Sequence, residues 1–294
     1  MEYLIFSIVF AGLSLLIPPL MDGIERKIRA RVHSRIGPPI TQTWYDLLKL
    51  FEKELVIPEG GLHIIILSLL YAMLAILTII FTVSMVLMGY RYVLIVIITL
   101  FLFVQAIFTT VPFITSNPFA IIGASREVML ALVNEVFFVI ILGLYMFFTG
   151  SPGLLLGSTS LLRASMILLV ITLFVSAYVA SGRIPFDIAE AEPELASGAL
   201  IEFSGPILGM FMYSNFIKRL FVKLVPSMLI LLPFTNNWLY LLIGSFAMAI
   251  ILWVLYGLIA ALLGRTRVDI APISILKIYI PFIIVSILLY LAGY

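Results

Sequence analysis

The sequence of 294 residues contains no cysteine, only two histidines and few charged residues. Without cysteine it can form no disulfide, no cysteine-ligated Fe–S cluster and no thiolate metal site. His33 and His63 alone argue against a bis-histidine haem. Charged residues make up 11% of the chain. A soluble domain carries about 25%.

Hydrophobic residues make up 63% of the chain, and the mean hydropathy is +1.24. A water-soluble globule of this size keeps roughly a quarter of its unfolded surface exposed, so it cannot hide that much apolar area. The composition therefore excludes a cytosolic enzyme, a nucleic-acid binder and a disordered chain. The surrounding medium must be lipid.

Long charge-free stretches predict an all-α polytopic membrane protein, with residues 1–294 forming a single integral membrane domain. A membrane helix takes about 20 apolar residues, and continuous rather than alternating runs favour helices over a β-barrel. Because Glu2 precedes the first run and Asp22 follows it, that run is expected to be a retained span rather than a signal peptide. The fourth span is expected to begin near Glu127. The eight predicted spans are Tyr3–Met21, Leu62–Met88, Tyr92–Pro112, Val136–Thr149, Ala164–Ser181, a run after Gly205, Trp238–Leu263 and Ile278–Tyr294.

Basic residues predict the orientation. The loops at about 22–61, 113–126, 182–204 and 264–271 share one side and hold eleven Lys and Arg, while the other side holds only Arg91 and Arg163. The positive-inside rule places these four loops in the cytoplasm and both termini outside.

The sixth span leaves two alternatives open. Between Gly205 and Pro233 the only charged residues are Lys218, Arg219 and Lys223. Either these bases lie near the middle of the membrane, or two short segments meet at a loop there. Lys218 and Lys223 could form a proton route with Glu and Asn side chains and water, or could reach the interface or a partner subunit.

A short amphipathic helix is predicted at the cytoplasmic interface, after the Gly37-Pro38-Pro39 turn. Its apolar residues recur at helical spacing, at Trp44, Leu47, Leu48, Phe51 and Leu55. Asp46, Lys49 and Lys53 line one face. For most bases of this loop, anchoring to lipid headgroups is the alternative to a specific site.

Two acids belong to the fourth span. An ionisable group within a span is costly, so Glu135 is a functional candidate; a hydrogen bond to a neighbouring helix is the alternative. Glu127 lies eight residues earlier, about 80° around the helix. It could instead be a first-turn acid that the helix dipole favours.

Five acids accompany Arg183 in the third cytoplasmic loop. Apolar residues such as Ile184 and Phe186 are interleaved with them, so the loop should be partly buried. Buried carboxyls of like charge do not all stay ionised, so such a cluster can take up and release protons when its surroundings move. The acids are Asp187, Glu190, Glu192, Glu194 and Glu202.

This loop resembles that of the core membrane subunit shared by respiratory complex I and membrane-bound NiFe hydrogenases, over roughly residues 20 to 270. Two further motifs resemble the family, one around Glu25-Arg26-Lys27 with Arg35 and one around Asp46, Lys49 and Lys53. Glu135 matches the intramembrane glutamate of the family's fourth helix. The loop residues that carry the resemblance are Arg183, Pro185, Phe186, Asp187, Glu190, Ala191, Glu192, Glu194, Leu195, Gly198, Glu202, Phe203, Ser204 and Gly205.

The resemblance implies a membrane anchor and coupling subunit in the plasma membrane of a prokaryote, without a cofactor or complete active site of its own. Its partners would be a peripheral arm with Fe–S clusters and, in one branch, a NiFe site, together with antiporter-like membrane subunits. The implied ion is a proton or sodium. Residues implied to dock the arm are Arg26, Arg35, Asp46, Lys49, Lys53 and Arg183. Those implied to relay protons are Glu127, Glu135, Asp187, Glu190, Glu192, Glu194, Glu202, Lys218 and Lys223.

Departures from the respiratory pattern favour the energy-converting hydrogenase and ferredoxin-linked branch. They are Pro206 after Ser204-Gly205, Asn215 in place of a glutamate, and the extra acid Glu127. The alternatives are the quinone-chamber subunit of an NADH, F420H2 or ferredoxin:quinone oxidoreductase, or a ferredoxin-linked sulfur reductase. An independent transporter is disfavoured, since the sequence has no evident internal repeat.

Overall fold

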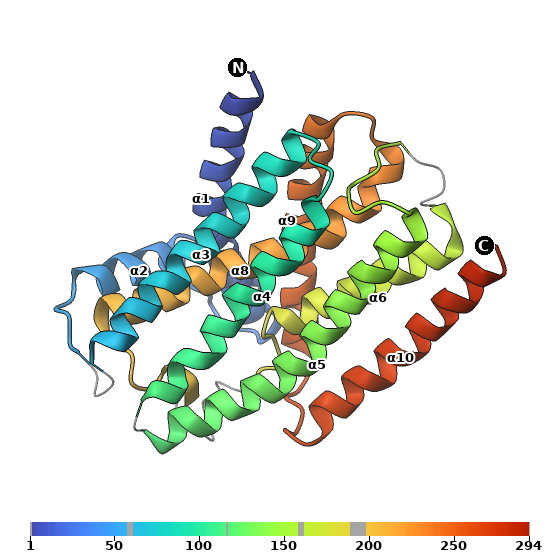
Figure 1. Cartoon of the computed structure of the whole chain (residues 1–294). Helices are drawn as coiled ribbons and strands as arrows, with labels where there is room; N and C mark the ends of the chain where they lie inside the picture. The colour runs from blue at the N-terminus through green and yellow to red at the C-terminus, as the bar shows by residue number, and fades with distance from the viewer. Residues whose placement is uncertain (1, 58–60, 116, 158–161, 189–197, 294) are drawn as a thin grey trace.

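A computed structural model describes residues 2–57, 61–115, 117–157, 162–188 and 198–293, and these contain helices but no strand. Each predicted apolar run forms one helix, and the predicted interfacial helix is present as α2 (Figure 1). The helices are α1 (Glu2–Val32), α2 (Gln42–Glu52), α3 (Leu62–Leu87), α4 (Val93–Thr110), α5 (Pro118–Thr149), α6 (Ala164–Ala180), α8 (Gly205–Leu231), α9 (Trp238–Leu262) and α10 (Ile270–Leu291), with short 3₁₀ turns η1 (Val111–Ile114), η3 (Gly198–Leu200) and η4 (Leu232–Phe234).

Six of the described helices, α1, α3, α4, α5, α9 and α10, are long and apolar enough to cross a membrane. The apolar helix α6 is shorter, with 17 residues. Helix α8 has 27 residues but carries three bases. The prediction of an all-α polytopic membrane protein is confirmed.

Three helix boundaries differ from those predicted. Helix α1 continues past Met21 to Val32, α5 begins at Pro118 rather than near Glu127, and α10 begins at Ile270 rather than Ile278. The start of α5 has a local cause: the Asn117 side chain accepts a hydrogen bond from Phe119 N at 2.9 Å, and Pro118 occupies the first turn. Charge-free stretches underestimate helix length, because polar residues near a helix end remain helical wherever they find partners.

Helix α8 is continuous, which resolves the two alternatives for the sixth span. Every residue from Phe216 to Leu229 is buried. The helix contacts α1, α2, α3, α6 and α9. Its bases therefore face protein rather than lipid, as ionisable groups within membrane proteins generally do.

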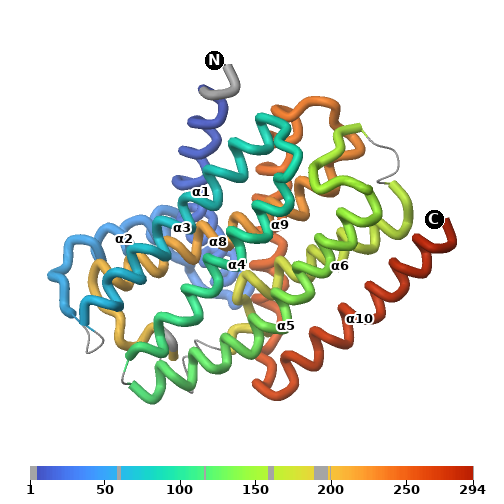
Figure 2. The backbone as a smooth tube through the Cα atoms, viewed as in Figure 1, coloured from blue at the N-terminus to red at the C-terminus, as the bar shows by residue number. Residues whose placement is uncertain are grey.

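The other helices surround this central element. Helices α3, α4, α5 and α10 slope in the same direction across Figure 1, with α3 packed on α4 and α4 on α5. The C-terminal helix α10 packs on α5 and α6 at one edge of the bundle, while α2 projects at the opposite edge (Figure 2). Thr43 and Leu47 of α2 are buried, whereas Lys49 is exposed.

Candidate functional site

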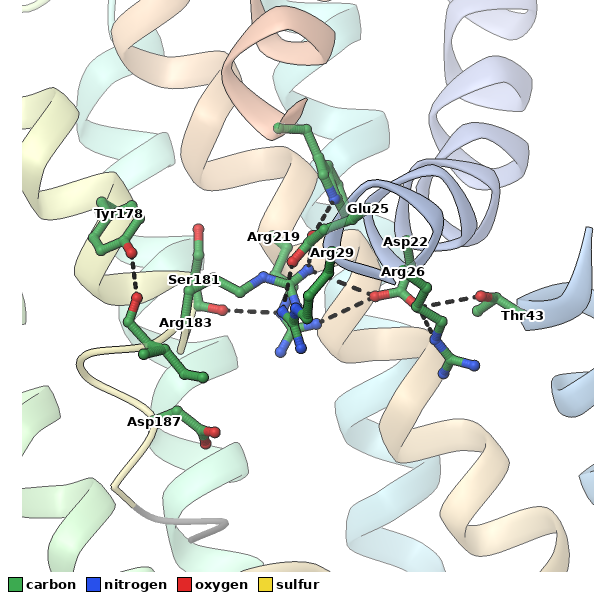
Figure 3. A network of polar contacts seen from close by, with 12 residues as sticks. Asp22, Glu25, Arg26, Arg29, Thr43, Tyr178, Ser181, Arg183, Asp187 and Arg219 are labelled. Atoms are coloured by element: carbon green, nitrogen blue, oxygen red, sulfur yellow. Dashed lines mark hydrogen bonds and ion pairs between the residues drawn. The ribbon is translucent and has the colours of Figure 1, made fainter. Parts of the chain in front are cut away.

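Four charged residues on successive turns of α1 form the start of a buried charge cluster (Figure 3). Asp22 and Arg29 each lie three or four residues from both Glu25 and Arg26, so the four share one face of the helix. Arg26 Nε lies 2.9 Å from Asp22 Oδ2, and Arg29 Nη2 lies 3.0 Å from Glu25 Oε1. Asp22 and Glu25 are only 5% and 2% exposed, so they need these partners.

Glu25 joins three elements of the fold. Besides Arg29, its carboxylate accepts hydrogen bonds from Arg183 Nη2 and, at 3.0 Å, from Trp253 Nε1 of α9. The Arg183 side chain is buried and also lies 3.5 Å from Asp22 Oδ1. Arg183 was expected on a docking surface. The structure places it in the interior instead, where it ties the chain after α6 to α1.

Two bases of α8 hold the end of α6. Arg219 Nε donates to Ser181 O at 2.9 Å, and Lys223 Nζ donates to Ser181 Oγ at 3.0 Å. Lys223 Nζ also lies 4.3 Å from the Trp253 ring centroid, a cation–π contact. Cations near the last carbonyls of a helix complement its dipole. Arg219 Nη1 is 3.8 Å from Asp22 Oδ1, which connects this group to the cluster on α1.

A second polar chain crosses from α8 to α5. Lys218 Nζ donates to Gln105 Oε1 of α4 at 3.0 Å, and Gln105 Nε2 donates to Glu127 Oε1 of α5 at 3.4 Å. Lys218 and Gln105 are 4% and 6% exposed. The candidates Glu127 and Lys218, far apart in sequence, are therefore linked through one amide.

Glu135 lies further along α5, beside a hydrogen-bonded asparagine. Asn134 Oδ1 accepts from Ser176 Oγ at 3.0 Å and from Tyr279 OH at 2.7 Å. One carboxylate oxygen of Glu135 is buried and has no hydrogen-bond partner among the described residues. Glu127, Asn134 and Glu135 line the same small cavity, as their angular spacing predicts.

Three cavities follow one another between these groups. The largest, of about 570 Å³, is lined by the charged residues of α1 and Arg183 and by apolar residues such as Phe203 and Phe211. A second, of about 30 Å³, shares Asn215 and Arg219 with the first and also reaches Asp187, Lys218 and Glu127. The third, of about 10 Å³, shares Glu127 with the second and ends at Glu135. We call these three spaces the cavity series.

The described part of the acidic loop is partly buried, as predicted: Phe186, Ile188 and Phe203 are buried. Asp187 pairs with Arg265 at 2.9 Å, and Glu202 accepts a hydrogen bond from Asn117 Nδ2 at the start of α5. Glu190, Glu192 and Glu194 lie outside the described residues.

The remaining docking candidates lie around α2. Arg35, Lys49 and Lys53 are exposed. Asp46 instead accepts from Arg26 Nη1 at 2.9 Å and so joins α2 to the charge cluster.

Sequence reasoning missed several partners in this site. Asp22 and Arg29 could have been found from their spacing with Glu25 and Arg26, and Gln105 from being polar within an apolar span. Nothing in the sequence indicates that the Trp253 indole would bond Glu25, because the two are 228 residues apart.

Gly257 on α9 packs so closely against Glu25 that a larger residue would not fit there. A Cβ at this position would lie 2.6 Å from Glu25 Cγ. We therefore expect Gly257→Ala to push the Glu25 carboxylate away from its partners and to cost about 1–3 kcal/mol, as overpacking does. Thermal unfolding of the purified protein checks this. Gly264→Ala, where a Cβ would meet open space, is the control, and equal melting of both variants would contradict the packing argument.

Fold and site together define a polytopic membrane protein with a buried charge cluster and with carboxylates inside the bundle on α5. The chain belongs to the NADH dehydrogenase family, whose sequence profile matches residues 4–291. It is 34% identical to hydrogenase-4 component C of Escherichia coli over 73% of this chain and 71% of that protein. Formate hydrogenlyase subunit 4 of the same organism is 30% identical over 91% and 92%. The predicted family is confirmed.

Two further relatives extend the comparison. A subunit of the NADH-quinone oxidoreductase of Pelagibacter ubique is 27% identical over 92% of this chain and 90% of its own. A chain in the structure of the membrane-bound sulfane sulfur reductase, an archaeal respiratory membrane complex, matches with a TM-score of 0.77 over 97% of this chain and 100% of that chain. At 23% identity, the latter shows a common fold.

Proposed function

We propose that this chain is the membrane anchor and coupling subunit of a hydrogenase-like, ion-translocating oxidoreductase complex. The observation that carries the proposal is the cavity series, which joins the charge cluster around Glu25 and Arg183 to Glu127 and Glu135 inside the bundle. The hydrogenase-4 and formate hydrogenlyase relatives support the hydrogenase-like assignment.

In this proposal, electrostatic interactions couple the redox reaction to ion transport. A redox change next to the acidic loop alters the preferred position of Asp187 and Arg183. Asp187 borders the second cavity, which Lys218 and Glu127 also line, and Arg183 borders the first, which shares Asn215 and Arg219 with the second. A change in the loop would therefore alter the electrostatic environment of the carboxylates on α5. Glu135, with its unsatisfied oxygen, is the end of the series that would pass a proton or an ion-linked signal to the next membrane subunit.

Redox centres belong to partner subunits in this proposal. What supports it is the absence of cysteine from the whole sequence. In the described part of the chain, no group of three or more His, Asp and Glu is placed to hold a metal ion. The exposed bases Arg35, Lys49 and Lys53 would face the peripheral arm from the cytoplasmic side, with both chain ends outside.

The test replaces Glu135 by glutamine in the intact complex reconstituted into liposomes. We expect the redox turnover to be retained and the number of ions moved per electron pair to fall, because glutamine keeps the shape but cannot carry a proton. Glu127→Gln should act in the same direction. Glu52→Gln, an exposed carboxylate on α2, is the matched control. Normal coupling in both Glu135→Gln and Glu127→Gln would refute the role of the cavity series.

A quinone-reducing role is the second candidate, and the 570 Å³ cavity with apolar residues in its lining is the observation that favours it. The relative from Pelagibacter ubique belongs to that branch by name. Purification of the complex separates the two. Hydrogen evolution by a NiFe partner supports the first proposal, and quinone reduction that quinone-site inhibitors block supports the second. Sulfur reduction instead would identify a sulfur reductase.

A further inference from the structure

A buried polar group joins α5, α6 and α10, which pack on one another at one edge of the bundle (Figure 1). Oδ1 of Asn134 on α5 accepts hydrogen bonds from Ser176 Oγ of α6 at 3.0 Å and from Tyr279 OH of α10 at 2.7 Å. Asn134 is 3% exposed, and Ser176 and Tyr279 are 0% exposed. Each of the three side chains therefore has the partner that a polar group inside a protein needs.

The two hydroxyl donors determine the orientation of the Asn134 amide. An asparagine side chain has an acceptor end, its carbonyl oxygen, and a donor end, its NH2 group. Ser176 and Tyr279 both donate to the oxygen, which accepts two hydrogen bonds at most. The end of Asn134 that remains for other groups is therefore the NH2 donor.

Asn134 also lines the third space of the cavity series, together with Glu127 and Glu135. The volume of this space is about 10 Å³, close to the smallest that holds one water molecule. One carboxylate oxygen of Glu135 is buried without a hydrogen-bond partner among the described residues. An NH2 group can donate to a carboxylate, directly or through one water, which the apolar lining residues such as Leu130 and Val179 cannot do.

We propose that Tyr279 is a positioning residue, which holds the Asn134 amide with its NH2 group toward the carboxylates of this cavity. This role rests on the coupling function proposed for Glu135. The Tyr279 ring is fully buried and packs on Phe137, with 5.2 Å between the ring centroids, so its hydroxyl cannot follow the amide if the amide turns. The Ser176 hydroxyl is less restrictive, because it can change position by rotation about one bond.

The chain that leads into α10 is also bonded to the acidic loop. Thr266 donates to Pro185 O through its backbone N at 3.1 Å and its hydroxyl at 2.7 Å, and Arg265 pairs with Asp187 at 2.9 Å. Helix α10 begins at Ile270, and Tyr279 lies roughly 13 Å along it. The hydroxyl that holds the Asn134 amide is therefore carried by the helix that follows directly on the segment attached to the loop.

The experiment replaces Tyr279 by phenylalanine, which keeps the ring and removes the hydroxyl, in the intact complex reconstituted into liposomes. We expect ion transport at unchanged redox turnover to fall roughly fivefold, the equivalent of one neutral hydrogen bond. Tyr256→Phe on α9 is the matched control. Tyr256 OH donates to Phe174 O at the same 2.7 Å, and Tyr256 lines none of the spaces of the cavity series. Both variants should lose similar thermal stability, but Tyr256→Phe should remain coupled.

Two further measurements separate positioning from stability. The infrared carboxyl band of Glu135, assigned by its loss in Glu135→Gln, depends on the hydrogen bonds that the carboxyl group makes. Tyr279→Phe should shift this band, and Tyr256→Phe should leave it unchanged. In an Asn134→Leu background, Tyr279→Phe should cause no further loss of ion transport, because Tyr279 acts through the amide that this background lacks.

A lower ion transport and a shifted Glu135 band in Tyr279→Phe, with neither in Tyr256→Phe, support the positioning role. An unshifted band overturns it, and so does an equal loss of coupling in Tyr256→Phe. If the band shifts and Glu135→Gln uncouples the complex but Tyr279→Phe does not, the amide has no part in coupling and the role also fails. If the band shifts while Glu135→Gln and Glu127→Gln both couple normally, the coupling function fails and Tyr279 still positions the amide.

Discussion

Replacement of Glu25 by alanine is expected to destabilise the subunit by about 3–5 kcal/mol, the cost of removing one partner from a buried ion pair. Glu25 is 2% exposed and accepts hydrogen bonds from Arg29, Arg183 and Trp253. Without the carboxylate, the acid that remains beside Arg183 among the described residues is Asp22, at 3.5 Å, and the buried Trp253 N–H loses its bond to Glu25. The loss of Coulomb attraction therefore adds to an unsatisfied donor.

Thermal unfolding of the purified complex, together with the fraction of subunit that assembles, measures this effect. Glu25→Gln keeps the side-chain shape and an acceptor for Trp253, so it should fall between wild type and Glu25→Ala. Glu52→Gln removes a carboxylate that is exposed on α2 and should change stability by no more than about 0.5 kcal/mol. If Glu25→Ala and Glu52→Gln have the same melting temperature, the charge cluster does not stabilise the fold.

A double-mutant cycle tests whether Glu25 and Arg183 stabilise the fold as a pair. Arg183→Gln leaves Glu25 with Arg29 and Trp253, so it should cost less than Glu25→Ala. Because the two side chains are in direct contact, the combined variant Glu25→Gln/Arg183→Gln should cost less than the sum of its parts. Additive costs would mean that the two groups stabilise the bundle separately.

Much of this molecule could be predicted from residue patterns, for physical reasons. Apolar runs of membrane length, such as Leu62–Met88, must form helices because lipid leaves backbone groups no other partner. The spacing that placed Glu127 and Asn134 on one face of a helix also placed them in one cavity. These inferences depend on local geometry, which sequence spacing determines.

The rest depends on which helices become neighbours. That Arg183 would turn inward could not be predicted, because it depends on Glu25 lying within reach across 158 residues. Likewise, only the packing of α8 against α4 brings Lys218 to Gln105. Helix propensity and hydropathy carry no information on such pairings, so the exposed or buried state of each base had to come from the structure.

The two lysines of α8, which the sequence treats alike, are predicted to differ in function. Lys218 borders the second cavity and donates to Gln105, which in turn contacts Glu127. Lys223 lines none of the three spaces of the cavity series. It bonds Ser181 and lies over the Trp253 ring, so its contacts are those of a group that holds the end of α6.

Lys218→Met should therefore uncouple the complex and Lys223→Met should not. Lys218→Met breaks the hydrogen-bonded path from α8 through Gln105 to Glu127. We therefore expect ion transport to slow by roughly 100-fold, the lower range for removing a proton-transfer group, while redox turnover continues. Lys223→Met loses a cation–π contact worth about 2 kcal/mol and hydrogen bonds worth about 1 kcal/mol each. It also removes the cost of burying the Lys223 charge, which is several kcal/mol. These contributions are similar in size, and Arg219 still bonds Ser181 O, so the melting temperature should change little. Ions moved per electron pair in liposomes and thermal unfolding of the same preparations measure both effects. If Lys223→Met uncouples and Lys218→Met does not, the coupling route runs through the end of α6 rather than through the cavity series.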